Sequence, residues 1–147
     1  VRERRPRFQP SREQRDALAH HFFAAARNGD LAGLESLLAE DVVLYGDGGG
    51  RVPAIQRPLH GRTQVAQTLV AWSRKGLQAG GATLREIEVN GAPGAMLRDA
   101  DGRLLAVMSV AFAGSQIATV TSVVNPDKLR HIGETGDMRS LVRRDRA

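Results

Sequence analysis

Two apolar stretches near the end of the chain constrain its fold most strongly. Residues 103–112 (Arg-Leu-Leu-Ala-Val-Met-Ser-Val-Ala-Phe) and 116–124 (Gln-Ile-Ala-Thr-Val-Thr-Ser-Val-Val) are rich in β-branched residues, and only Ala-Gly-Ser separates them. Two such runs with a short glycine-containing gap are typical of a β-hairpin. The first run is apolar on both faces, which predicts a central strand covered on two sides. The second alternates better, as expected of a neighbour with one covered face.

Helix and strand signals before this hairpin follow a clear order. Ser11 and Gln14 form a capping box for a first helix that ends at Gly29, and Asp30 can cap a second helix. The remaining elements are expected at residues 41–46 (strand), 51–60 (an irregular edge strand with two prolines), 61–76 (helix), 82–89 and 95–99 (strands), before the hairpin itself.

This order predicts an α+β fold in which helices gather on one side of a curved antiparallel sheet. It is similar to the cone-shaped SnoaL-like or ketosteroid-isomerase-like fold. That resemblance implies a curved, mixed-to-antiparallel sheet that wraps three helices and leaves an apolar cavity open at one end. A chain of 147 residues fits one such domain. We divide it into an arginine-rich linker (1–10), a SnoaL-like domain (11–132) and a polar C-terminal tail (133–147).

Composition excludes several classes of protein. The chain has no cysteine, which rules out disulfide scaffolds, thiolate zinc sites and cysteine nucleophiles. No apolar run approaches the roughly 20 residues that span a membrane, so we expect a cytoplasmic protein without membrane contact. The net charge of +5 is concentrated in residues 1–15, which hold six arginines and two glutamates. The basicity therefore belongs to a terminal arm and favours a solvated linker over a folded nucleic-acid-binding face.

Asp47-Gly48-Gly49-Gly50-Arg51 is the most unusual local feature of the sequence. Three consecutive glycines cost backbone entropy and add no packing. Such a run is typical of a place where another backbone approaches closely or where φ is positive, and a flexible surface turn is the alternative. No Gly-Lys-Ser/Thr follows, so the run is not a phosphate-binding loop.

A second motif directly follows the hairpin and consists of Asn125, Pro126, Asp127, Lys128, Leu129 and Arg130. Asn-Pro ends the strand, and proline suits the first position of a short helix. Taken alone, this motif is equally typical of a plain connection between a strand and a helix.

Together with Arg5-Pro6-Arg7-Phe8, the two motifs resemble the C-terminal part of extracytoplasmic-function sigma factors that carry a SnoaL-like extension. In that family an Asp-Gly-Gly-Gly motif lies after the first strand, and Asn-Pro-Asp-Lys-Leu follows the last. The resemblance covers nearly the whole chain, and the arginine-rich start corresponds to the exit from the promoter-binding half. The length leaves no room for the two helical sigma domains, so we expect the extension alone.

This resemblance implies a regulatory domain without catalytic residues, cofactor or metal. It would dock against the promoter-binding sigma domains of the same polypeptide and bias them between compact and polymerase-competent arrangements. Residues 47–51 and 125–130 would form the interdomain contact surface. RNA polymerase core is a further implied partner, and DNA would be reached only through N-terminal domains outside these 147 residues.

Two other functions are open, because the same cone hosts isomerases and hydrolases. The first is an isomerase-type enzyme or small-molecule-binding protein for an apolar substrate. Its acids and bases would come from Tyr45, Asp47, His60, Glu88 and Asp99, whose spacing specifies no catalytic pair. Its pocket would be lined by Tyr45, His60, Trp72, Met108 and Phe112. No spacing of His and carboxylates predicts a metal site. The second is a homodimerisation module, since a broad sheet face can pair with its own copy.

Overall fold

The computed structural model describes residues 11–47, 57–78, 80–89 and 91–123. Its elements are, in order, α1 (Arg12–Asn28), α2 (Leu31–Leu37), β1 (Leu38–Asp47), β2 (Leu59–His60), α3 (Arg62–Trp72), the π-helix η2 (Ser73–Gln78), β3 (Thr83–Val89), β4 (Ala92–Arg98), β5 (Leu104–Ala113) and β6 (Gln116–Val123). The predicted order of two helices, two strands, a helix and a four-strand meander is confirmed. The predicted linker, the C-terminal tail and most of the irregular second strand lie outside the described residues.

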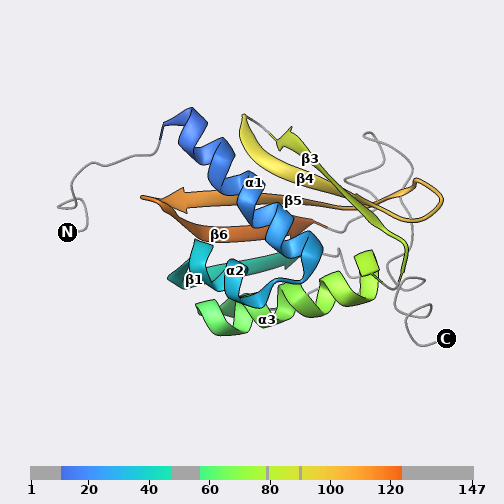
Figure 1. The fold of residues 1–147 in the computed structure, drawn as a ribbon, viewed down its shortest axis with the longest axis horizontal. Helices are drawn as coiled ribbons and strands as arrows, with labels where there is room; N and C mark the ends of the chain where they lie inside the picture. Colours follow the sequence, from blue (N-terminus) through green and yellow to red (C-terminus); the bar gives the residue numbers. More distant parts are fainter. Residues whose placement is uncertain (1–10, 48–56, 79, 90, 124–147) are drawn as a thin grey trace.

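The strands form one six-stranded sheet in the order β2-β1-β6-β5-β4-β3. Strands β3 to β6 pair antiparallel with their chain neighbours, as a meander does. Strand β1 instead lies parallel to β6, and β2 pairs antiparallel with β1 at the edge. The sheet is therefore mixed. The helices lie over one of its faces (Figure 1), which we call the inner face, and the opposite face is the outer face.

The hydrophobic core lies between the inner face and the helices. Phe22 and Phe23 of α1 are both fully buried and contact each other edge to face, with ring centroids 5.1 Å apart. Strand β1 contributes Val42 and Leu44 to the same cluster. Burying a phenylalanine side chain contributes about 1.5–3 kcal/mol, so α1 is held on the sheet mainly by its apolar face.

The predicted helix caps are confirmed by their hydrogen bonds. The Ser11 hydroxyl accepts from the Gln14 backbone N–H at 3.1 Å, and the Gln14 side chain accepts from the Ser11 N–H at 2.8 Å. Helix α1 ends at Gly29, whose φ of +66° is the left-handed conformation that glycine adopts easily. The Asp30 carboxylate accepts from the Gly33 N–H at 3.0 Å and caps α2.

The hairpin of β3 and β4 differs from the prediction, which began the second strand only at residue 95. Val89 pairs with Ala92, so only two residues connect the strands, and Pro93 and Gly94 belong to β4. A Cβ atom on Gly94 would lie 2.5 Å from the Met108 carbonyl oxygen. The glycine is thus required by close packing within the sheet rather than by a turn.

The predicted coverage of β5 on both faces holds for the first half of the strand only. Leu104, Leu105 and Ala106 are all buried, whereas Ala111 near the end of the strand is exposed. Leu105 packs in a small separate cluster with Ala82, partly covered by neighbouring leucines. In the second half of β5, Met108 and Val110 belong to the core on the inner face, and the described outer-face residues are partly or fully exposed.

Candidate functional site

The two sequence motifs begin on neighbouring strands. Because β1 and β6 run parallel, both end at the same edge of the sheet, and Tyr45 and Asp47 pair with Thr121 and Val123. Asp47 is the first residue of the glycine motif, and the second motif begins two residues after Val123. We call this edge the rim. Residues 48–51 and 125–130 themselves lie outside the described residues, but both segments start from adjacent strand ends, which are about 4.8 Å apart in a sheet.

Pairing between the first and last strands explains this convergence. Val42 and Leu44 of β1 point to the core, as does Val120 of β6, and all are fully buried. Since side chains alternate along a strand, the residues between them point to the outer face. Because β1 and β6 are the second and third of the six strands, the rim lies within the end of the sheet rather than at its corner.

The five residues predicted to line a pocket do not share one space. Met108 is buried in the core cluster, and Trp72 and Phe112 pack against that cluster from the inner side. Tyr45 is 44% exposed and alternates with the buried Leu44, and His60 is exposed beside Val43. The sheet itself therefore separates Tyr45 and His60 from the other three. The prediction missed this because it did not assign the two faces of β1.

The candidate acids and bases also fail to converge. Glu88 lies at the end of β3, with its side chain 60% exposed and 3.6 Å from Arg12. Asp99 follows β4 at the opposite end of the sheet, where its carboxylate accepts from the backbone N–H groups of Asp101 and Arg103, both at 2.9 Å. Asp99 thus stabilises the turn into β5. Tyr45 and His60 lie on the outer face, so these four described side chains form no catalytic pair.

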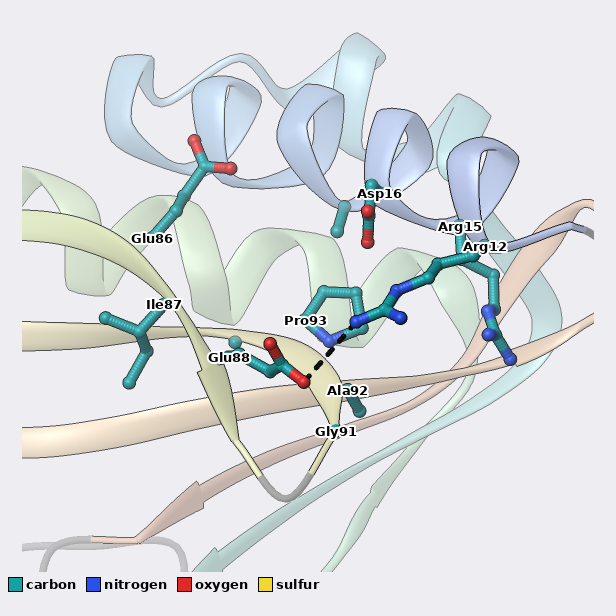
Figure 2. Close-up of a pocket in the computed structure, with 11 residues that line it drawn as sticks. Arg12, Arg15, Asp16, Glu86, Ile87, Glu88, Gly91, Ala92 and Pro93 are labelled. Atoms are coloured by element: carbon teal, nitrogen blue, oxygen red, sulfur yellow. Dashed lines mark ion pairs between the residues drawn. The ribbon is translucent and has the colours of Figure 1, made fainter.

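A groove of about 260 Å³ lies between the first turns of α1 and the hairpin of β3 and β4 (Figure 2). Its uncharged lining includes Ala19 of α1 and Ile87, Ala92, Pro93 and Gly94 of the hairpin. Five charged side chains also line it: Arg12, Arg15, Asp16, Glu86 and Glu88. It is therefore not the apolar cavity that the resemblance implied, and it suits an apolar substrate poorly.

The charges beside the groove are largely balanced within the chain. The Glu86 carboxylate lies 3.0 Å from His20 Nδ1 and 3.8 Å from Arg27, and Figure 2 shows Arg12 reaching across to Glu88. We call these contacts the α1–β3 seam. Sequence reasoning missed the seam, since α1 and β3 are far apart in the chain. The only local signal was that Glu86 and Glu88 share one face of a strand.

Within the described ranges, no group of three or more His, Asp or Glu side chains is arranged to hold a metal ion. No helix among those residues is long and apolar enough to cross a membrane.

The three helices and the curved six-stranded mixed sheet form the SnoaL-like or ketosteroid-isomerase-like cone fold, which is also that of NTF2-like proteins. No protein-family model and no curated protein sequence matches this chain. The similarities found are therefore similarities of structure.

The extracytoplasmic-function sigma factor SigJ of Mycobacterium tuberculosis matches with a TM-score of 0.64 at 23% identity, over 79% of this chain and 44% of that one. A candidate ketosteroid isomerase from Kribbella flavida matches with a TM-score of 0.57 at 20% identity, over 76% and 78% of the two chains. A candidate polyketide cyclase from Xanthomonas campestris matches with a TM-score of 0.55 at 22% identity, over 80% and 94%. The chain thus spans less than half of SigJ, and these identities establish the fold alone.

Proposed function

We propose that this chain is the regulatory C-terminal domain of an extracytoplasmic-function sigma factor, acting in the cytoplasm. It modulates promoter-specific transcription initiation through contacts with the promoter-binding sigma domains of the same polypeptide or with RNA polymerase core. DNA is contacted by those preceding domains and not by this one. The domain has no catalytic residues in this role.

One observation carries the proposal: the glycine motif and the Asn-Pro-Asp-Lys-Leu motif start from the paired residues Asp47 and Val123 at one rim. Two segments about 75 residues apart in sequence are thereby available to a single partner surface. The glycines permit close backbone approach, and Asp127 and Lys128 supply charges that can define the register of docking. The structural similarity to the sigma factor SigJ supports the same assignment.

The test uses the full-length sigma factor and a reporter for its promoter. Gly49→Val and Asp127→Lys are each expected to change transcription severalfold, because each alters one segment of the shared contact. If both segments touch the same domain, their effects are coupled, so the double variant should change transcription by clearly less than the product of the single effects.

Asp16→Lys is the matched control for the change of charge, since Asp16 is exposed on α1, which lies over the inner face and away from the rim. Combined with Gly49→Val, it should give a strictly multiplicative result. Circular dichroism of each purified variant checks that the fold is kept. Multiplicative effects of Gly49→Val and Asp127→Lys would exclude a shared surface, and normal transcription in both would exclude the regulatory role.

The alternative function is a small-molecule-binding protein or an isomerase- or hydrolase-type enzyme of the same cone. It is favoured by the fold similarity to the candidate isomerase and the candidate cyclase. Its test is turnover of a ketosteroid or epoxide by the purified chain, with Asp47→Asn and His60→Ala as variants. Turnover that either variant abolishes would replace the sigma-factor proposal with this one.

A further inference from the structure

The outer face of the three central strands carries a group of uncharged side chains. They alternate with core residues and pair across β1, β6 and β5, and they are Val43, Tyr45, Thr119, Thr121, Val123, Val107, Ser109 and Ala111. Each of them is partly or fully exposed. We call this group the outer patch. The solvated face of a sheet usually carries polar and charged residues, so a face with three valines, an alanine and an exposed tyrosine among its hydroxyl groups is a candidate contact surface.

Among the described residues, the charged positions on this face lie around the patch. Asp41 in the first half of β1, His60 on β2 and Arg85 on the edge strand β3 are all exposed, and Asp47 pairs with Val123 at the rim. An uncharged centre with a polar border is the usual composition of a protein–protein interface. The outer patch therefore has the anatomy of an interface rather than that of a solvated surface.

Tyr45 is the most conspicuous member of the patch. It is 44% exposed. Among the described residues, only one other large hydrophobic side chain, Leu31 at 38%, is exposed to a similar extent. Tyrosine offers a large contact area at a low cost in side-chain entropy and is enriched at interface hot spots. Tyr45 pairs with Thr121, immediately before the Asp47–Val123 pair at the rim. The patch is thus continuous with the rim.

The size of the patch indicates that it is only part of an interface. Three strands about 4.8 Å apart, over five or six residues at about 3.3 Å each, cover roughly 250 Å². A standard interface buries about 800 Å² on each partner. A partner that uses the patch must therefore extend beyond it, and the continuous surface is the rim.

The geometry of the N-terminus is consistent with such a partner. Helix α1 begins beside the turn of β3 and β4, where Arg12 contacts Glu88, and β6 ends at the opposite end of the sheet (Figure 1). The eight residues of β6 span about 26 Å, whereas ten extended residues reach at most about 33–36 Å. Residues 1–10 are thus long enough to let a preceding domain lie over the outer patch as far as the rim.

We propose that the promoter-binding domain that precedes this chain docks over the outer patch as well as the rim, with Tyr45 as an anchor of the contact. This inference rests on the proposed function and names a second part of its interface. The motifs contribute close backbone approach and charge, and the outer patch contributes buried apolar area around Tyr45.

The test compares Tyr45→Thr with Leu31→Ala in the full-length sigma factor. Threonine, like tyrosine, is a residue that strands favour, and Leu31 is similarly exposed but lies on α2, away from the patch. Loss of an anchor is expected to change promoter output at least about fivefold in the same direction as Gly49→Val. It should also increase the radius of gyration in small-angle scattering. Leu31→Ala should leave both quantities unchanged.

The outcomes separate this inference from the function on which it rests. If Gly49→Val changes promoter output and Tyr45→Thr does not, the role of the patch is overturned and the regulatory function still stands. Normal output in both variants would overturn the regulatory function itself. If Tyr45→Thr instead abolishes a dimer in analytical ultracentrifugation and leaves transcription unchanged, the patch joins two copies of this chain, which also overturns the proposal.

Discussion

The α1–β3 seam and the outer patch are both partly exposed surfaces of the same sheet, but their chemistry is opposite. At the seam, Glu86 meets His20 and Arg27, and Glu88 meets Arg12. In the outer patch, no member carries a charge, and the helices α1, α2 and α3 lie over the opposite face of the sheet (Figure 1). The seam is a contact whose charges are already matched within the chain. The patch has the composition of a contact whose other half is not part of the described fold.

The comparison also separates what holds the domain together from what it presents to other molecules. Exposed ion pairs contribute only about 0–1 kcal/mol each, since solvent screens them. The seam therefore orients α1, whereas the buried phenylalanines hold this helix on the sheet. Four variants test this division, and we order them by the expected loss of stability.

The largest effect is expected from Phe23→Ala. Phe23 is fully buried where α1 packs on the sheet, and truncating a buried phenylalanine costs about 3–5 kcal/mol. Chemical denaturation followed by circular dichroism measures this loss. The conservative variant Phe23→Leu should retain much of the stability. If Phe23→Ala lost less stability than the seam variant Glu86→Gln, ion pairs and not apolar packing would hold α1 on the sheet.

Gly94→Ala should have the next largest effect. Its new Cβ would lie 2.5 Å from the Met108 carbonyl oxygen and 2.6 Å from Val89 Cγ2, so β4 must shift against its neighbours. Such overpacking costs about 1–3 kcal/mol. Ala111→Ser on the exposed part of β5 is the control and should be nearly neutral in the same denaturation experiment. Equal stability of the two variants would contradict the close approach of β4 to β5.

Glu86→Gln removes the central carboxylate of the seam. Its side chain is 31% exposed, so the expected loss is at most about 1 kcal/mol. The loss should shrink as salt rises, because ionic strength screens exposed charges. Glu40 is exposed and has no described ion pair, so Glu40→Gln controls for the loss of a negative charge. A loss that does not depend on salt would show that Glu86 acts by packing.

Tyr45→Thr should have the smallest effect on the isolated chain, within about 0.5 kcal/mol, as for other exposed positions. This loss should not depend on salt. The chain has one tyrosine and one tryptophan, so tryptophan fluorescence follows unfolding of wild type and variant alike. A loss above about 2 kcal/mol would place Tyr45 in the fold of the domain itself and remove the contrast between patch and core.

Local patterns in the sequence were sufficient for the elements and their order. The Ser11–Gln14 capping box, the cap by Asp30 and the hairpin of β5 and β6 each depend on residues close together in the chain. Periodicity and turn residues report such local geometry directly. The α+β class follows from the order of these elements, because few arrangements can bury their apolar faces.

Tertiary structure alone decided which distant residues meet. The parallel pairing of β1 with β6 joins Tyr45 to Thr121, and no local pattern specifies which strand lies beside which. The same pairing determines which side of β1 faces the helices, and so puts Tyr45 on the outer patch while Leu44 enters the core. A shift of one residue in register would exchange these faces. Burial of the apolar set against α1 and α3 selects one register, and that energy belongs to the whole fold rather than to any segment of the sequence.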